Sequence, residues 1–456
     1  MIRIDRQRTP AGLLPKINRV FELSAQKIRS LEATWRPEDG APVFTVDGVY
    51  RSRGWTEWTQ GFQFGAPLLQ FDATGDREFL EMGRSHTLER MAAHLTHVGV
   101  HDHGFNNVST YGNLWRLARE GKFEADAWEI RFYALALKVT GAVQATRWTA
   151  LPEGGFIYSF NGAHSLFVDT IRTLRALALA HVLGHRLLVE QDAPVNLLQR
   201  LLQHAHATAT YSVYLGKGRD GYDVRGRTAH ESLFNPVNGT YRGPSSQQGY
   251  SPFSTWTRGL AWAMLGFAEQ LEFLDSLDAD AMVRAQPDPL YDAACATCDF
   301  YIEHGAAADG VPYWDTGAPG LAAMQDWGAR AADPFNEHEP VDSSAAAIAA
   351  QGLLRLARVV KTRGGDGRRY EQAGLRVLET LIDEGGPYLS AEATHQGLLL
   401  HSIYHRPNGW DHVPAGSRIP RGESSMWGDY HLREAALYVK RLAEDGTYYT
   451  FFGGRK

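Results

Sequence analysis

Helical hydrophobic periodicity recurs along almost the whole chain, whereas the alternation typical of β-strands is scarce. The pattern predicts twelve successive helices, over residues 12–33, 55–72, 76–94, 107–119, 122–139, 163–183, 191–214, 253–275, 289–305, 342–363, 367–384 and 425–442. The turns between them contain Gly, Asp, Asn and Pro, as in FDATGDREF and TRGGDGRRYE. Because long and short connections alternate, the helices suit six antiparallel hairpins closed in a ring. We therefore expect an all-α fold, an (α/α)6 barrel of six helical hairpins.

The composition is typical of one large globular domain. Of the 456 residues, 44% are hydrophobic and 21% are charged, and no change in composition marks a linker, so we expect a single domain over residues 1–456. The formal net charge of −6 indicates no nucleic-acid partner. Polar residues interrupt the apolar stretches near the N-terminus, and no later segment has the length of a membrane span. We expect a cytoplasmic protein without a membrane partner, and the oligomeric state stays open.

Three long segments do not fit the helical pattern: residues 215–252, 306–341 and 386–424, which are rich in Gly, Ser, Asn and Pro. Loops of this length are uncommon unless they are functional. Because they also contain many His, Trp, Tyr and Arg residues, we expect them to form a binding rim.

The two cysteines, Cys295 and Cys298, lie in the predicted helix over residues 289–305. A structural zinc site needs four ligands, and nothing nearby supplies the other two. We expect both thiols in the core, where small buried cysteines are common.

The segment VGVHDHGFNN places His101, Asp102 and His103 directly before a predicted helix. Asp102 could cap that helix by accepting backbone N–H bonds, and the HDH triplet alone favours this structural interpretation. A metal site or a catalytic site is the alternative, because histidine and aspartate are good ligands.

Asp169 lies early in a strongly apolar helix, in SLFVDTIRTLRALALA. A carboxylate in such a place is costly unless it is paired, protonated or facing a polar cavity. The structural alternative is a first-turn position, where it interacts favourably with the helix dipole. The pattern by itself leaves both interpretations open.

Aromatic and polar residues gather in a long loop and the helix after it, in HESLFNPVNGTYRGPSSQQGYSPFSTWTRGLAWA. The candidates for binding a sugar are His230, Gln248, Trp256, Arg258 and Trp262. Arginine offers a fork of donors suited to a carboxylate, and indole faces pack against sugar rings. A lone tryptophan is more often a core residue, but this cluster favours a sugar subsite. In ESSMWGDYHLREAAL, packing is the simplest interpretation of the aromatic residues.

Taken in order, these segments resemble the unsaturated glucuronyl hydrolases of glycoside hydrolase family 88. The matching pieces are WTQGFQFG, TGDREFL, HDHGF, FVDTIRTLRAL, HESLFNPVNGTYRG, GYSPFSTWTRGLAWAMLGFA, DSSAAAIAAQGLLRLA and SSMWGDYHLREAAL, and they extend from about residue 20 to residue 445. The resemblance implies an (α/α)6-barrel glycosidase that needs neither metal nor cofactor. Its implied substrate is an oligosaccharide made by a lyase, from whose non-reducing end it releases a 4,5-unsaturated uronic acid.

The resemblance also implies roles for single residues. Asp169 matches the family's general acid/base, and Asp102 matches a second carboxylate in the pocket. The matching substrate-binding residues are His101, His230, Gln248, Arg258, Trp58, Trp256 and Trp262. Phe160 stands where the family usually has tryptophan, which leaves the substrate preference open. Segments 215–227, 276–290 and 405–421 are longer than usual, and we expect them to shape the far side of the cleft.

The implied reaction is hydration of the C4=C5 vinyl ether by a protonated Asp169. Asp102 would raise the pKa of Asp169, and Arg258 and His230 would neutralise the substrate carboxylate. Four alternatives stay open: an unsaturated rhamnogalacturonyl hydrolase, an (α/α)6 glycosidase or lyase that uses two carboxylates on other substrates, a sugar-binding barrel without activity, and a metal hydrolase. The last would use His101, Asp102, His103 and His204 or His206.

Overall fold

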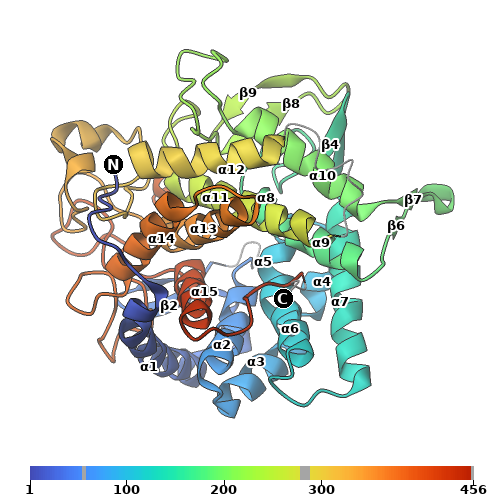
Figure 1. Ribbon diagram of the computed structural model, residues 1–456, viewed down its shortest axis with the longest axis horizontal. Helices are drawn as coiled ribbons and strands as arrows, with labels where there is room; N and C mark the ends of the chain where they lie inside the picture. The colour runs from blue at the N-terminus through green and yellow to red at the C-terminus, as the bar shows by residue number, and fades with distance from the viewer. Residues whose placement is uncertain (54–57, 278–287, 453–456) are drawn as a thin grey trace.

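The computed structural model describes residues 1–53, 58–277 and 288–452, and within them the helices form two concentric rings (Figure 1). The inner ring consists of α2 (Gln60–Thr74), α5 with α6 (His103–Asn107 and Asn113–Arg119), α8 with α9 (Thr170–Thr173 and Arg175–Val182), α11 (Thr257–Ser276), α13 (Ser343–Thr362) and α15 (Met426–Ala443). The outer ring consists of α1 (Pro10–Thr34), α3 with α4 (Arg77–Arg90 and Ala92–Leu95), α7 (Ala127–Thr146), α10 (Leu197–Ala207), α12 (Pro289–Phe300) and α14 (Arg368–Leu381). The predicted all-α (α/α)6 barrel is confirmed.

The two rings differ in how their sequences distribute apolar residues. Helix α13 is buried on almost every side, from Ser343 through Ala357, because its small alanines let neighbouring helices approach from both flanks. Helix α14 buries only one face, which carries Leu375, Leu378 and Leu381, and exposes charged residues on the other. An amphipathic helix of this kind belongs at the periphery of a barrel.

The inner helices all begin at the same end of the barrel. Residues at or just before the starts of α2, α5, α8 and α11 line one pocket: Trp58, Asp102, Asp169 and Trp256. The starts of α13 and α15 lie beside them, because Asp342 pairs with Arg258 and Trp427 stacks on Trp58. One end of the barrel therefore collects the polar residues that precede its helices.

Short antiparallel strand pairs occupy the connections between the helices. The pairs are β1 with β2 (Pro42–Val46 and Val49–Ser52), β3 with β4 (Trp148–Leu151 and Gly154–Ile157), and β6 with β7 (Leu187–Leu188 and Pro194–Val195). A three-stranded sheet has the order β5 (Ser165–Phe167), β8 (Glu231–Phe234), β9 (Tyr241–Ser245). This sheet joins the segment before α8 to the long loop before α11.

The predicted boundaries differ from the structure in several segments. Residues 163–169 form strand β5 and a turn instead of helix, because Ser165–Phe167 pairs with residues 231–233; a three-residue strand is not separable from a helix by periodicity. Helix 122–139 is displaced to Ala127–Thr146, where Asp126 caps its start. The range predicted as a helix over 191–214 begins with strand β7, and its helix, α10, starts at Leu197. In the predicted helix over 55–72, residues 55–57 lie outside the described residues.

Arginine–glutamate ion pairs fill part of the barrel interior. Arg172 donates to Glu269 and Glu434, and all three side chains are at most 1% exposed. Arg355 lies in the same network, with its Nη1 bonded to Glu272. Buried charges are costly unless they are paired and hydrogen-bonded, and here each arginine has carboxylate partners.

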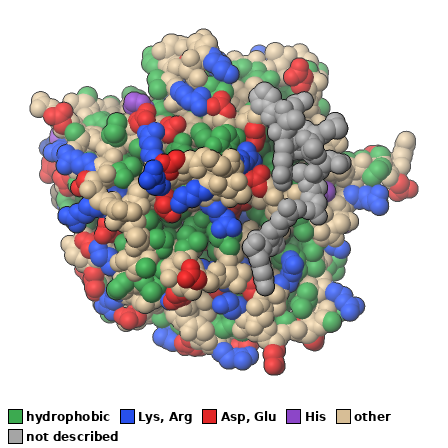
Figure 2. All heavy atoms as spheres, viewed as in Figure 1, with side chains coloured by type: hydrophobic (Ala, Val, Ile, Leu, Met, Phe, Trp, Pro, Cys, Tyr) green, Lys and Arg blue, Asp and Glu red, His purple; other side chains and the backbone are tan. Residues whose placement is uncertain are grey.

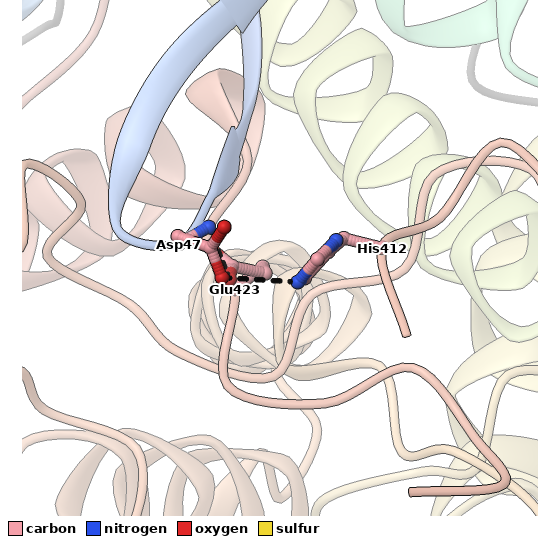
Figure 3. Close-up of side chains that lie close together, drawn as sticks. All are labelled: Asp47, His412 and Glu423. Atoms are coloured by element: carbon pink, nitrogen blue, oxygen red, sulfur yellow. Dashed lines mark hydrogen bonds and ion pairs between the residues drawn. The ribbon is translucent and has the colours of Figure 1, made fainter. Parts of the chain in front are cut away.

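The β1–β2 hairpin is fastened to the long connection between α14 and α15 (Figure 3). Glu423 Oε1 accepts the backbone N–H of Asp47 at 2.9 Å, and its Oε2 accepts that of Gly48 at 3.3 Å. His412 Nε2 lies 3.3 Å from Asp47 Oδ1. The turn of the hairpin, residues 47 and 48, is thereby held beside Glu423 and His412.

The surface shows no single-sign field on the face drawn in Figure 2, where acidic and basic side chains are interspersed. Among the described residues, no helix has the length and hydropathy needed to cross a membrane.

Candidate active site

A cavity of about 530 Å³ opens at the end of the barrel where the inner helices begin. Its size lies in the range of small-molecule sites, about 300–1,000 Å³. The lining residues are Arg53, Trp58, His101, Asp102, Phe160, Asp169, Gln247, Gln248, Trp256, Arg258, Trp262, Tyr404, His405, Asn408 and Trp410. The structure therefore brings together in one pocket all the predicted site residues except His230.

Two carboxylates and a histidine form the floor of this pocket. His101 Nε2 lies 3.7 Å from Asp102 Oδ1 and 3.9 Å from Asp169 Oδ1. His101 is 1% exposed, Asp102 6% and Asp169 7%. Asp102 makes no cap bond to α5, so the capping interpretation is wrong for its side chain. Asp169, the residue directly before α8, makes no cap bond either. Asp169 Oδ1 is buried without a hydrogen-bond partner among the described residues.

Gly104 is the residue that lets the two carboxylates approach each other. A Cβ at this position would lie 2.4 Å from the carbonyl oxygen of Thr173 and 2.5 Å from its Cα. The backbones of α5 and of the α8 segment therefore touch where Gly104 meets Thr173. Gly104 is two residues after Asp102, and Thr173 is four residues after Asp169. The glycine of the HDHGF motif is required by this close approach.

The three floor groups alter one another's pKa values. Burial opposes a charge on His101, but the negative charges of Asp102 and Asp169 raise its pKa. Burial raises the pKa of Asp102. Burial also favours the neutral form of Asp169, yet the neighbouring His101 holds its pKa below the usual value. The directions of these shifts favour a charged His101 and an ionised Asp169 in the free protein, whereas the expected role of Asp169 as a proton donor needs its protonated form.

His230 lies behind the pocket wall. Its ring centroid is 4.5 Å from that of Phe167 and 4.7 Å from that of Trp256. The backbone N–H groups of Gln247 and Gln248 donate to its Nδ1 at 2.9 and 3.2 Å, so the neutral ring carries its proton on Nε2. Burial lowers the pKa of His230 to about 4. His230 is thus neutral at pH 7 in the free protein, and its expected role toward the substrate carboxylate stays a prediction.

Both terminal nitrogens of the Arg258 guanidinium already donate to protein acceptors. Its Nη2 donates to Gln248 Oε1 and to the carbonyl of Tyr404, both at 2.7 Å. Its Nη1 donates to the carbonyl of Ile403 and lies 3.4 Å from Asp342 Oδ2. The predicted direct fork between Arg258 and a substrate carboxylate is not available in this arrangement, and the arginine instead orients the amide of Gln248.

Aromatic rings form the walls. Trp58 stacks on Trp427 with ring centroids 5.0 Å apart, and Trp262 lies 4.8 Å from Phe105. Trp427 is fully buried, so the packing interpretation holds for it, and the same is true of Tyr430. Phe160, the position at which the sequence departs from its expected family, lines the pocket beside His101.

The sequence analysis missed one wall of the pocket. This wall consists of His405, Asn408 and Trp410, from the segment HRPNGWDH, and of Tyr404, the residue before that segment. Asp411 holds this loop, because its Oδ2 accepts the backbone N–H of His405 at 3.0 Å. The composition of loop 386–424 predicted a binding rim, and the extra length of 405–421 pointed to the same place. Of the other two long segments, 276–290 lies mostly outside the described residues, and none of residues 215–227 is among those that line the pocket.

The geometry does not support the metal-hydrolase alternative. His103 contacts Thr140 Oγ1 at 2.7 Å and the carbonyl of His97 at 2.9 Å, away from His101. His204 accepts the backbone N–H of Ile157, and His206 is exposed. The cysteines are free and lie in α12, with Cys298 buried as expected. In the part of the chain that the structure describes, the potential ligands that converge are the hairpin contacts Asp47, His412 and Glu423.

An (α/α)6 barrel with buried carboxylates under an aromatic-walled pocket defines a carbohydrate-active hydrolase. No family model matches the chain. The unsaturated glucuronyl hydrolase of Bacillus sp. (strain GL1) is 26% identical over 395 residues, which cover 85% of this chain and 87% of that protein. The unsaturated chondroitin disaccharide hydrolase of Streptococcus pyogenes serotype M1 is 24% identical over 432 residues, covering 92% and 90%.

Solved structures agree on the fold. An unsaturated glucuronyl hydrolase specific for heparin superimposes with a TM-score of 0.72 and 19% identity, over 94% of this chain and 98% of that one. The enzyme from Streptococcus agalactiae gives a TM-score of 0.70 and 20% identity, over 99% of both chains. The predicted resemblance to the unsaturated glucuronyl hydrolases is thereby confirmed, together with the predicted class, a glycosidase.

Proposed function

We propose that this protein hydrates the C4=C5 double bond of a 4,5-unsaturated uronic acid at the non-reducing end of an oligosaccharide. The observation that carries the proposal is the buried Asp169, whose free Oδ1 lies on the pocket floor within ion-pair distance of His101. The similarity of the chain to unsaturated glucuronyl hydrolases favours this substrate over a saturated or rhamnogalacturonan-derived one.

One acid can perform both proton transfers of this reaction. Asp169 donates its proton to C4, and the positive charge that develops at C5 is shared with the ring oxygen. Asp169 then takes a proton from the water whose oxygen adds to C5. The resulting hemiketal opens to a ketone, and the hemiacetal left at C1 releases the attached sugar. Asp102 forms and breaks no bond to the substrate, unlike the second carboxylate of most glycosidases.

The floor residues supply the proton that Asp169 needs. In the free protein His101 holds it between the two carboxylates. A bound uronate adds a negative charge and excludes water, and both effects raise the pKa of a carboxylic acid. The proton then moves from His101 to Asp169, so the three groups titrate as one unit.

The substrate carboxylate is bound through Gln248 in this proposal. Its Oε1 accepts from Arg258, which leaves its Nε2 amide hydrogens for the ligand. The positive charge of Arg258 lies directly behind the amide, and His230, behind the same wall, accepts the backbone N–H of Gln248 at its Nδ1.

The function is tested with unsaturated uronyl disaccharides. We expect the absorbance of the conjugated double bond to disappear in step with release of the second sugar, which a reducing-sugar assay measures. A protein that binds these disaccharides but leaves the absorbance constant would be a sugar-binding barrel, and the proposed function would be wrong.

Arg258→Lys is expected to lower kcat/KM by about 10–100-fold, the scale of a lost charged hydrogen bond. A lysine cannot bind Gln248 and the carbonyls of Ile403 and Tyr404 together. Most of the loss should appear in KM, because Arg258 acts through substrate binding. Gln248→Leu should show the same KM effect with Arg258 intact, and a normal KM in that variant contradicts the assignment. Thermal unfolding of both variants reports any loss of fold.

A further inference from the structure

The β6–β7 hairpin projects from the side of the barrel as an arm formed by residues 185–196 (Figure 1). Its strands, Leu187–Leu188 and Pro194–Val195, are antiparallel. At its tip, Gln191 and Asp192 both have a φ of 58°, in the left-handed region that tight hairpin turns use. The chain therefore builds a defined arm of two strands, although two strands alone are marginally stable in water unless further strands or a helix join them.

The outer edge of strand β6 carries backbone groups that do not face β7. The backbone N–H of Val189 donates to the carbonyl of Ala193 at 3.0 Å and so points toward β7. Since N–H and C=O groups alternate in direction along an antiparallel strand, those of Leu188 point the other way. Pro194, opposite Leu188, has no N–H to offer it. No other strand in the described part of the chain pairs with β6, so this edge is a template for a strand of another molecule.

Three apolar residues between two opposite charges follow this edge, in the order Arg186, Leu187, Leu188, Val189, Glu190. Leu188 is 58% exposed and Val189 43%, while Leu187 packs partly against the core. Arg186 and Glu190 are exposed, and neither forms an ion pair with a residue that the structure describes. Both the apolar and the charged side chains of the edge are therefore available to a partner.

This stretch is complementary to a second copy of itself. When two such strands run antiparallel and are centred on Leu188, Arg186 of each copy faces Glu190 of the other. Leu188 then faces Leu188, and Leu187 faces Val189. Opposite charges and apolar residues directly across an antiparallel pair stabilise it. Each contact occurs twice, as a two-fold symmetric interface requires.

We propose that the arm is a dimerisation element, in which strand β6 pairs with strand β6 of a second copy of this chain, centred on Leu188. The two arms then form a four-stranded sheet, which supplies the strands that one arm lacks. This pairing brings the tip of each arm to the base of the other. At that base Val182 is 39% exposed at the end of α9, and Leu135 is 56% exposed on α7, the helix that contacts β6.

Analytical ultracentrifugation of the full chain over a range of concentrations tests this proposal. We expect the parent to form a reversible dimer. Arg186→Glu and Glu190→Arg each replace two attractive pairs by two repulsive ones, so each should raise the dissociation constant by at least about tenfold. The two variants change the net charge in opposite directions, so a general charge effect cannot weaken both. Arg77→Glu, an exposed position on α3 away from the arm (Figure 1), should leave the dissociation constant unchanged.

Mixing the two single variants gives the sharpest measurement. In the mixed dimer every acidic side chain at the edge faces a basic one again, so association should return to within about threefold of the parent. Both positions are exposed, and both variants should keep the thermal unfolding temperature of the parent. A parent that stays monomeric at every concentration, or a dimer that both variants leave unchanged, would overturn the proposal. Two weakened variants that fail to associate when mixed would overturn the pairing centred on Leu188.

Discussion

Asp169→Asn is expected to lower kcat by about two to four orders of magnitude, the usual scale for loss of a general acid–base. The side chain of Asp169 makes no cap bond to α8, so the isosteric amide should leave the fold intact. Turnover of an unsaturated disaccharide, followed by absorbance, measures the effect. Asp126→Asn is a matched control, because Asp126 caps the outer helix α7 far from the pocket lining. Activity of Asp169→Asn within tenfold of the parent would remove Asp169 from the mechanism.

The neighbouring Asp102 offers a second measurement on the same cluster. Asp102→Asn should also be severely impaired, because the proton balance of the floor changes. In the parent protein, the negative charge of Asp102 helps to raise the pKa of His101. Without that charge the cluster releases its proton at lower pH, so the alkaline limb of the pH–rate profile should move to lower pH. An unchanged profile would contradict the shared-proton arrangement.

The largest expected difference is between two substrates. An unsaturated uronyl disaccharide should be cleaved, while the same disaccharide with a saturated glucuronic acid should be inert. The saturated sugar has no vinyl ether that Asp169 could protonate, and the pocket floor is arranged for proton transfer to C4. Product analysis of both compounds at equal enzyme concentration is the measurement. Comparable rates would identify an ordinary glucuronidase.

The hydration step has its own signature. In heavy water, deuterium should enter at C4 from one face at early times, before enolisation of the ketone product exchanges it. Mass spectrometry of the released uronic acid detects the label. Product without deuterium would mean that the glycosidic bond is broken directly.

The order of the helices could be predicted from local patterns in the sequence, and most of the pocket residues from the resemblance to the unsaturated glucuronyl hydrolases. The predicted helix over 342–363 is observed as Ser343–Thr362, and that over 425–442 as Met426–Ala443. Polar and aromatic residues stand just before the inner helices, and ring closure brings those starts to one end. Strand β5 was missed because a strand of three residues is too short to show the alternation that distinguishes a strand from a helix.

Contacts across the barrel decided the remaining chemistry. Whether Arg258 is free for a ligand depends on the carbonyl of Ile403, which lies 145 residues away in the sequence. The directions in which the pKa values of His101 and Asp169 shift depend on the close approach of α5 and the α8 segment at Gly104. Arg53 lines the pocket although no pattern in the sequence singled it out. Local patterns determine helices, but hydrogen-bond saturation and pKa values depend on distances between segments that only the folded chain sets.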